Sequence, residues 1–156
     1  MTTHIRLTCM LALSVLVVSG TFSRPEHKIG KKNVPVAVLK AFEKTYPKAT
    51  ARGYAKETEN GRTEFEIESR EGSIARDVSF DGTGSIISVE ETLPAADLPE
   101  PVHAALMKDY PKAKILKCEK VTENGATNFE IRIASGKRRM EAVYTAEGAA
   151  VDRGKK

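Results

Sequence analysis

The stretch that decides the fold is Thr58-Glu59-Asn60-Gly61-Arg62-Thr63-Glu64-Phe65-Glu66-Ile67. It returns as Thr122-Glu123-Asn124-Gly125-Ala126-Thr127-Asn128-Phe129-Glu130-Ile131. Asn-Gly between two alternating runs is a strong hairpin signal, because a type I′ turn needs positive φ at both central residues. The chain is therefore expected to contain two copies of one unit built around a hairpin.

The duplication extends well beyond the hairpin. Residues 34–88 align with residues 98–152 without a gap when the sequence is shifted by 64 positions. The matched positions include prolines, glycines and the segment Tyr-Pro-Lys-Ala, which starts at Tyr46 in one copy and at Tyr110 in the other. A fixed spacing of this kind indicates an internal repeat.

Each copy is expected to open with a helix. Asn33 and Asp97 stand at matching positions, both residue types cap helices well, and a proline follows two residues later, where the first turn tolerates it. Pro47 and Pro111 are expected to end the helices. Helical spacing predicts the buried faces, which are Val38, Ala41, Phe42 and Tyr46 in the first copy and Val102, Ala105, Leu106 and Tyr110 in the second.

The Asn-Gly turns set the register of the first two strands. Facing residues point to the same side of a sheet, so Tyr54, opposite Ile67, shares its inner face. Phe65 lies on that face as well. In the second copy the inner face is predicted to hold Leu116, Cys118, Phe129, Ile131 and Ile133.

A second tight turn, at Glu71-Gly72 and again at Ser135-Gly136, leads to a third strand. With these pairs as central residues, Val78 is expected opposite Phe65 and Phe80 opposite Thr63, with Ala142 and Tyr144 as their counterparts. Glu66 would then face Asp77, and Glu130 would face Glu141. A fourth strand is expected over Ile86, Ile87 and Val89, with a short version at Ala150-Val151.

The fold class that follows is α+β, a tandem repeat of a helix and a four-stranded antiparallel meander. One sheet face would pack on the helices and the other would face water. A unit of about 60 residues is marginal by itself, so the copies are expected to share a core.

Residues 1–23 are predicted to be a secretory signal peptide, because the apolar run from Leu7 to Val18 is short for a membrane span and small residues follow at Ser19, Gly20 and Ser23. An uncleaved anchor is the alternative, and Cys9 lacks the context of a lipoprotein site. The expected organisation is a basic linker at 24–32, repeats at 33–92 and 97–152, and a basic tail at 153–156. The protein is expected to be periplasmic or secreted.

The net charge is +4, but much of the excess lies in that linker and tail. Nucleic-acid binding is not expected, because the repeats lack a basic face with stacking aromatics. Cleavage would leave Cys118 as the single cysteine, so no disulfide could form within the mature chain. Its inward position favours a small core residue over a reactive thiol or an intermolecular disulfide.

The pattern resembles the PepSY-like, β-lactamase-inhibitor-protein-like family of exported bacterial proteins. The helix that ends in Tyr46-Pro47, the Phe-Glu-Ile strand and the turn from Phe80-Asp81 to Gly84 carry the resemblance, which covers roughly residues 34–152. The second copy departs at Thr145-Ala146-Glu147-Gly148, which lacks the aspartate. The resemblance implies a tandem α/β fold in which two sheets form one concave surface that grips an enzyme. PepSY domains have been proposed to restrain peptidases.

The candidate site is the acidic open face. Its members are Glu57, Glu64, Glu66, Glu68, Asp77, Glu130 and Glu141. Three hypotheses remain: a solvated sheet face, a surface that attracts a basic protein partner, and a divalent-cation site. Tyr46 and Tyr110 are interpreted as core residues whose hydroxyls reach the surface, and the lone His103 of the repeats as a surface or filling residue.

No catalytic residues, metal ligands or cofactor are predicted, because no nucleophile accompanies a base and no glycine-rich phosphate loop is present. The first hypothesis is an exported, non-enzymatic binding module, acting as an inhibitor of a peptidase or other envelope enzyme or as an interaction protein, and a monomer or weak oligomer. The second is a periplasmic protein that binds a small ligand or divalent cation. An enzyme of unfamiliar type is the third.

Overall fold

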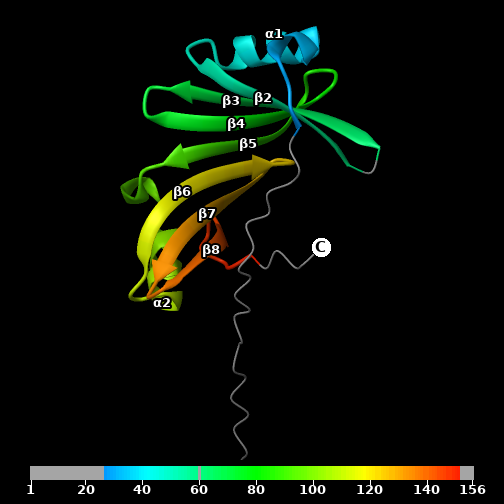
Figure 1. Cartoon of the computed structure of the whole chain (residues 1–156). Helices are drawn as coiled ribbons and strands as arrows, with labels where there is room; N and C mark the ends of the chain where they lie inside the picture. Colours follow the sequence, from blue (N-terminus) through cyan, green and yellow to red (C-terminus); the bar gives the residue numbers. More distant parts are fainter. Residues whose placement is uncertain (1–26, 60, 152–156) are drawn as a thin grey trace, which may run out of the picture.

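The computed structural model describes residues 27–59 and 61–151. The expectations for the signal peptide, for residues 24–26 of the linker, for Asn60 and for the basic tail lie outside the described residues. The fold is α+β, with a single eight-stranded antiparallel sheet and two α-helices (Figure 1). The strands follow one another in the sheet in the order of the chain, from β1 to β8.

The two halves of the chain, residues 27–93 and 94–151, share the order of a 3-10 turn, an α-helix and three strands, and among the described residues the first half has β1 and β5 in addition. The first half contains β1 (His27–Lys28), η1 (Lys31–Asn33), α1 (Val36–Thr45), β2 (Thr50–Glu59), β3 (Arg62–Glu71), β4 (Ile74–Asp81) and β5 (Ile86–Leu93). The second contains η2 (Ala95–Asp97), α2 (Glu100–Asp109), β6 (Lys114–Glu123), β7 (Ala126–Ser135) and β8 (Arg138–Thr145). From η1 to β4, each element has a counterpart of equal length 64 residues later.

The helices begin later than the sequence indicated. Asn33 and Asp97 do not cap them but lie in the short 3-10 turns, and Pro35 and Pro99 occupy the N-cap positions. The reason is that Val34, which precedes proline, is extended (φ −86°, ψ 134°), so the helix cannot start before it. The ends are as predicted, because both helices stop one residue before the Tyr-Pro pair.

The register of the Asn-Gly hairpins is confirmed. Tyr54 pairs with Ile67 and Glu57 with Glu64, and in the second half Cys118 pairs with Ile131. Asn124 (φ 50°) and Gly125 (φ 79°) both have positive φ, as a type I′ turn requires.

The predicted register of the β3–β4 hairpin is wrong by two residues, and so is that of β7–β8. Phe65 pairs with Phe80 and Ile67 with Val78, while Phe129 pairs with Tyr144 and Ile131 with Ala142. The central residues are Gly72-Ser73 and Gly136-Lys137, with glycine at positive φ in the first place (59° and 60°). That is the pattern of a type II′ turn, which needs glycine first rather than second.

A bulge in β2 and another in β6 shift the start of each strand. The pairing skips Arg52 in β2 and Leu116 in β6. Leu116 was predicted on the inner face, but the bulge turns it outward and 40% of its surface is exposed.

The core is divided, contrary to the prediction that the copies share one. One cluster contains Val34, Val38, Phe42, Phe65, Ile67, Val78 and Phe80. The other contains Leu98, Val102, Leu106, Cys118, Phe129, Ile131, Ile133, Met140, Ala142 and Tyr144. The halves share the sheet instead, because β5 pairs with β4 on one side and with β6 on the other. The predicted fourth strand of the second half is reduced to an isolated bridge between Tyr144 and Ala150.

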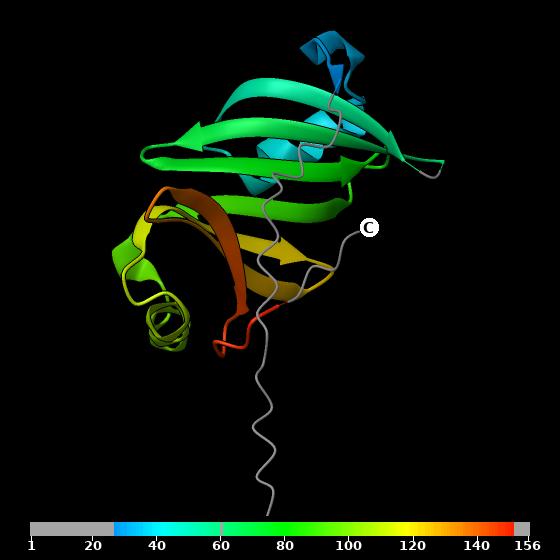
Figure 2. The same ribbon diagram turned by 60° about the horizontal axis from the view of Figure 1, so that its bottom comes forward.

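Both clusters lie on the same face of the sheet. Val89 packs against the first and Leu93 against the second, and these two residues of β5 point to the same side. The sheet curves along its width, with α1 and α2 on its outer side and near its two ends (Figures 1 and 2). The opposite face, here called the open face, carries neither of the two described α-helices.

Candidate functional site

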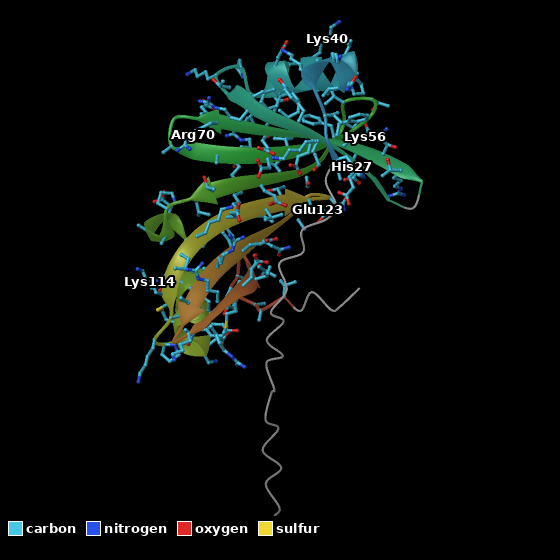
Figure 3. All side chains as sticks on the ribbon, viewed as in Figure 1. His27, Lys40, Lys56, Arg70, Lys114 and Glu123 are labelled. Atoms are coloured by element: carbon cyan, nitrogen blue, oxygen red, sulfur yellow. The ribbon has the colours of Figure 1, made fainter. Side chains whose placement is uncertain are left out.

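The open face collects the acidic residues that the sequence singled out. Strand alternation places all seven predicted residues there, because each lies between inward-facing neighbours on its strand. On β3 the acidic residues Glu64, Glu66 and Glu68 are half-buried and alternate with Phe65 and Ile67, which are buried. Figure 3 shows the side chains over this sheet, with Lys114 and Glu123 marking the two ends of β6.

The acidic residues of the first half form two rows across the strands. In one row Glu57 of β2 faces Glu64 of β3. In the other, Glu68 of β3 faces Asp77 of β4, which faces Glu90 of β5. Carboxylates opposite one another cost stability. These two rows, called the acidic rows below, therefore concentrate negative potential on half of the open face.

The predicted acidic pairs are different ones. Glu66 faces Ser79, and Asp77 faces Glu68 rather than Glu66. Glu130 faces Val143 on one side and Glu119 on the other, so it does not face Glu141. The corrected positions follow from the two-residue shift of the β3–β4 and β7–β8 hairpins.

The second half of the open face is mixed in charge. Glu141 faces Arg132, with 4.0 Å between carboxylate and guanidinium. Lys117 lies 2.5 Å from the carboxylate of Glu119, which is buried. Val121, which occupies the position of Glu57, is buried as well. The excess of negative charge on the open face therefore belongs to the first half.

The open face is shallow. A hollow of about 10 Å³ lies among the acidic residues, lined by Ala55, Glu57, Glu64, Glu66 and Ser79. That volume holds about one water molecule. Among the described residues, no group of three or more His, Cys, Asp or Glu side chains is placed to hold a metal ion. This hollow is therefore too small to enclose an organic ligand.

A groove that the sequence did not predict lies between α1 and β2. Its volume is about 330 Å³, and it is lined by Lys31, Leu39, Phe42, Glu43, Ala49, Thr50, Ala51 and Tyr54. Lys31 and Glu43 stand 3.9 Å apart at its exposed rim. β1 pairs only with Ala55 and Lys56 of β2, so the groove lies beside the part of β2 that β1 does not reach. No motif marks the groove, because it arises where a neighbouring strand ends.

The remaining single residues behave as expected of core or surface. Cys118 is buried, and burial together with the neighbouring Glu119 raises the pKa of its thiol. Burial also raises the pKa of the Tyr46 and Tyr110 hydroxyls, and both rings pack against the clusters. His103 is exposed on α2.

Comparison with known families matches this arrangement to one of them. The family described as "Putative beta-lactamase-inhibitor-like, PepSY-like" matches the sequence twice, over residues 21–88 and 63–151. The chain belongs to this PepSY-like family. No curated protein matches the sequence.

Solved structures share the PepSY-like fold. A BLIP-like protein from Bacteroides fragilis superposes with a TM-score of 0.61 at 20% identity, over 76% of this chain and 84% of that one. A "putative periplasmic" protein from Bacteroides eggerthii gives 0.65 at 15% identity, over 76% and 86%. A DUF2874 family protein from Bacteroides uniformis gives 0.63 at 17%, over 76% and 86%. At these identities the similarity establishes the fold.

Within residues 27–59 and 61–151, neither α-helix has the length and hydrophobicity needed to cross a bilayer.

Proposed function

We propose that this PepSY-like protein is an exported, non-enzymatic binding module that uses the acidic half of its open face to hold a basic region of a protein partner. Restraint of an envelope enzyme is the role that fits the resemblance to inhibitor-like proteins. A location outside the cytoplasm is supported by the periplasmic descriptions of its structural neighbours and by the signal-peptide pattern of residues 1–23.

The observation that carries the proposal is the row Glu68, Asp77 and Glu90, which crosses three neighbouring strands on the face that neither described α-helix covers. A partner with cations at matching positions would add ion pairs to this row and would be steered to the face by its negative potential.

The test is capture of a partner from the envelope fraction of the native host, comparing wild type with Glu68→Lys/Asp77→Lys. Both positions belong to this row and are half-buried on the open face. The matched control is Glu43→Lys/Glu100→Lys, which makes the same charge change at exposed positions on the helices. The open-face variant should lose capture while the control keeps it, and added salt should weaken the wild-type complex. Equal capture by both variants would contradict the proposal.

A second candidate, binding of a small ligand, is favoured by the groove between α1 and β2, whose volume falls in the range of small-molecule sites. It predicts stabilisation by a ligand without any partner protein. Ala51→Trp would fill the groove, so it should abolish a ligand-induced rise in Tm and leave partner capture unchanged.

A further inference from the structure

The sheet ends at β8 with an edge that is covered at one end only. Among the described residues, the outer side of β8 carries the bridge from Tyr144 to Ala150 and two bonds near its C-terminal end, from Val151 N to Val143 O at 2.8 Å and from Thr145 N to Ala149 O at 2.9 Å. In the first half the matching strand, β4, is covered much further. There Arg76, Asp77, Val78 and Ser79 all pair with residues of β5.

The backbone of β8 shows which groups face outward. Peptide groups in an antiparallel strand alternate between its two neighbours, and the Val143 carbonyl faces outward because it accepts from Val151. The N–H and C=O groups of Arg139 and Glu141 therefore face outward too. Asp77, the counterpart of Glu141, uses the same side to pair with Glu90 of β5.

The charge at this edge is strongly positive. Lys137 lies in the turn before β8, Arg138 and Arg139 begin the strand, and all three are exposed. Glu141, the only acidic residue of β8, lies 4.0 Å from Arg132 of the neighbouring strand. The positive excess at this edge therefore comes from Lys137, Arg138 and Arg139.

We propose that the edge of β8 binds an extended acidic segment of a partner protein as an added strand, in the place that β5 takes beside β4. Such strand addition draws its affinity from backbone hydrogen bonds and its specificity from alternate side chains. The segment would run antiparallel to β8. It would set an apolar residue beside Ala142, as Val89 lies beside Val78, and acidic residues toward Arg138 and Arg139.

Charge favours an acidic partner segment over two other occupants of this edge, namely the residues after Val151 and a second copy of β8. The sequence after Val151 reads Asp-Arg-Gly-Lys-Lys, so three of its five residues would bring cations to a cationic edge. A second copy of β8 would bring the same net positive charge. Net like charge opposes both pairings, whereas an acidic segment gains from the cations at the edge.

The test is the binding of a labelled peptide to the full chain, measured by fluorescence anisotropy. The probe has the sequence Ser-Ile-Ile-Ser-Val-Thr-Leu-Glu-Glu, which is that of residues 85–93 with the last four residues reordered so that the glutamates fall beside Arg139 and Arg138 when valine lies beside Ala142. The control peptide carries Lys at both Glu positions. The acidic probe should bind, the lysine peptide should not, and Arg138→Glu/Arg139→Glu should weaken the acidic probe about tenfold or more.

Proline substitution separates strand addition from simple charge attraction. Glu141→Pro removes an outward N–H, which an edge strand tolerates, so the urea midpoint should stay while probe binding falls about tenfold or more. Asp77→Pro removes the matching N–H where β5 already pairs with it, so it should destabilise the fold. Wild-type binding by Glu141→Pro would overturn the proposal. A lowered urea midpoint for Glu141→Pro, or tighter binding by a variant that ends at Asp152, would overturn it too, because the chain itself would then cover the edge.

Discussion

The guanidinium carbon of Arg76 lies 4.3 Å from the centre of the Tyr46 ring. Its Nε donates to Glu91 at 2.6 Å and its Nη1 stands 3.5 Å from Glu71, while the side chain is only 7% exposed. A buried cation thus joins the end of α1 to β4 and β5. In the second half the same position holds Met140, so this charged cluster belongs to the first half alone.

Loss of Glu91 and loss of Arg76 should lower the free energy of unfolding by different amounts. Glu91→Leu leaves a cation buried beside one remaining carboxylate, and it should lower the free energy of unfolding by about 3 kcal/mol. Arg76→Met leaves Glu91, whose side chain is 28% exposed and can reach water, so about 1 kcal/mol is expected. Urea unfolding followed by circular dichroism measures both values. A larger loss for Arg76→Met would contradict this account of the cluster.

The turn between β4 and β5 should tolerate only glycine at position 84. Gly84 has φ 90°, and a Cβ there would lie 2.7 Å from the carbonyl oxygen of Ala37 on α1. Gly84→Ala should therefore cost about 3 kcal/mol of unfolding free energy, as the sum of strain and overlap.

Gly72→Ala is the matched control for Gly84→Ala. Gly72 also has positive φ, but nothing lies within 4 Å of an added Cβ, so only strain of about 1 kcal/mol is expected. Equal losses at the two positions would show that the contact with α1 contributes nothing.

Asp81 should make stability depend on pH in the acid range. Its Oδ1 accepts from Thr83 N at 2.8 Å, Thr83 Oγ1 at 2.6 Å and Ser85 N at 3.0 Å, and these bonds lower the pKa of the carboxyl below 3.8. A lowered pKa means that the contribution is complete above the unfolded value and is lost as pH falls through the folded value. The difference in urea midpoint between wild type and Asp81→Ala should therefore be full at pH 7 and should shrink below about pH 4. A difference that stayed constant with pH would show that the ionised carboxylate is not what stabilises the turn.

Cys118 should resist thiol reagents in the folded protein. The side chain is 3% exposed, and burial raises the pKa of the thiol, so both access and thiolate are limited. Labelling should be slow in buffer and fast in urea. A cysteine introduced by Leu116→Cys in a Cys118→Ala background supplies the control, because position 116 lies on the bulge and should react quickly. Fast labelling of native Cys118 would contradict its inward position.

The local turn chemistry explains which parts of the sheet could be predicted from sequence. Asn-Gly prescribes one turn type and hence one register, so the pairing of Tyr54 with Ile67 followed directly. A single glycine in Glu71-Gly72-Ser73 fits either central position of a turn, so Phe65 was paired with Val78 rather than with Phe80. Nothing in the sequence marks the bulge at Leu116, because a bulge is set by the neighbouring strand.

The sequence predicted which acidic residues lie on the open face, but not which of them face one another across the strands. Alternation alone assigned Glu64, Glu66 and Glu68 to the open face, and the structure places them there. Their partners depend on the register, so the row through Asp77 and Glu90 appeared only with the structure. The part of β8 that no described strand covers could not be predicted either, because this requires knowing that the fourth strand of the second half shrinks to a bridge at Ala150.

The position of β5 between β4 and β6 has a consequence for melting. Two separate cores would allow two separate thermal transitions. However, β5 is hydrogen-bonded to β4 and to β6, so the unfolding of either half removes a hydrogen-bonded strand from the edge of the other. Calorimetry should therefore give a single cooperative peak whose van't Hoff and calorimetric enthalpies agree.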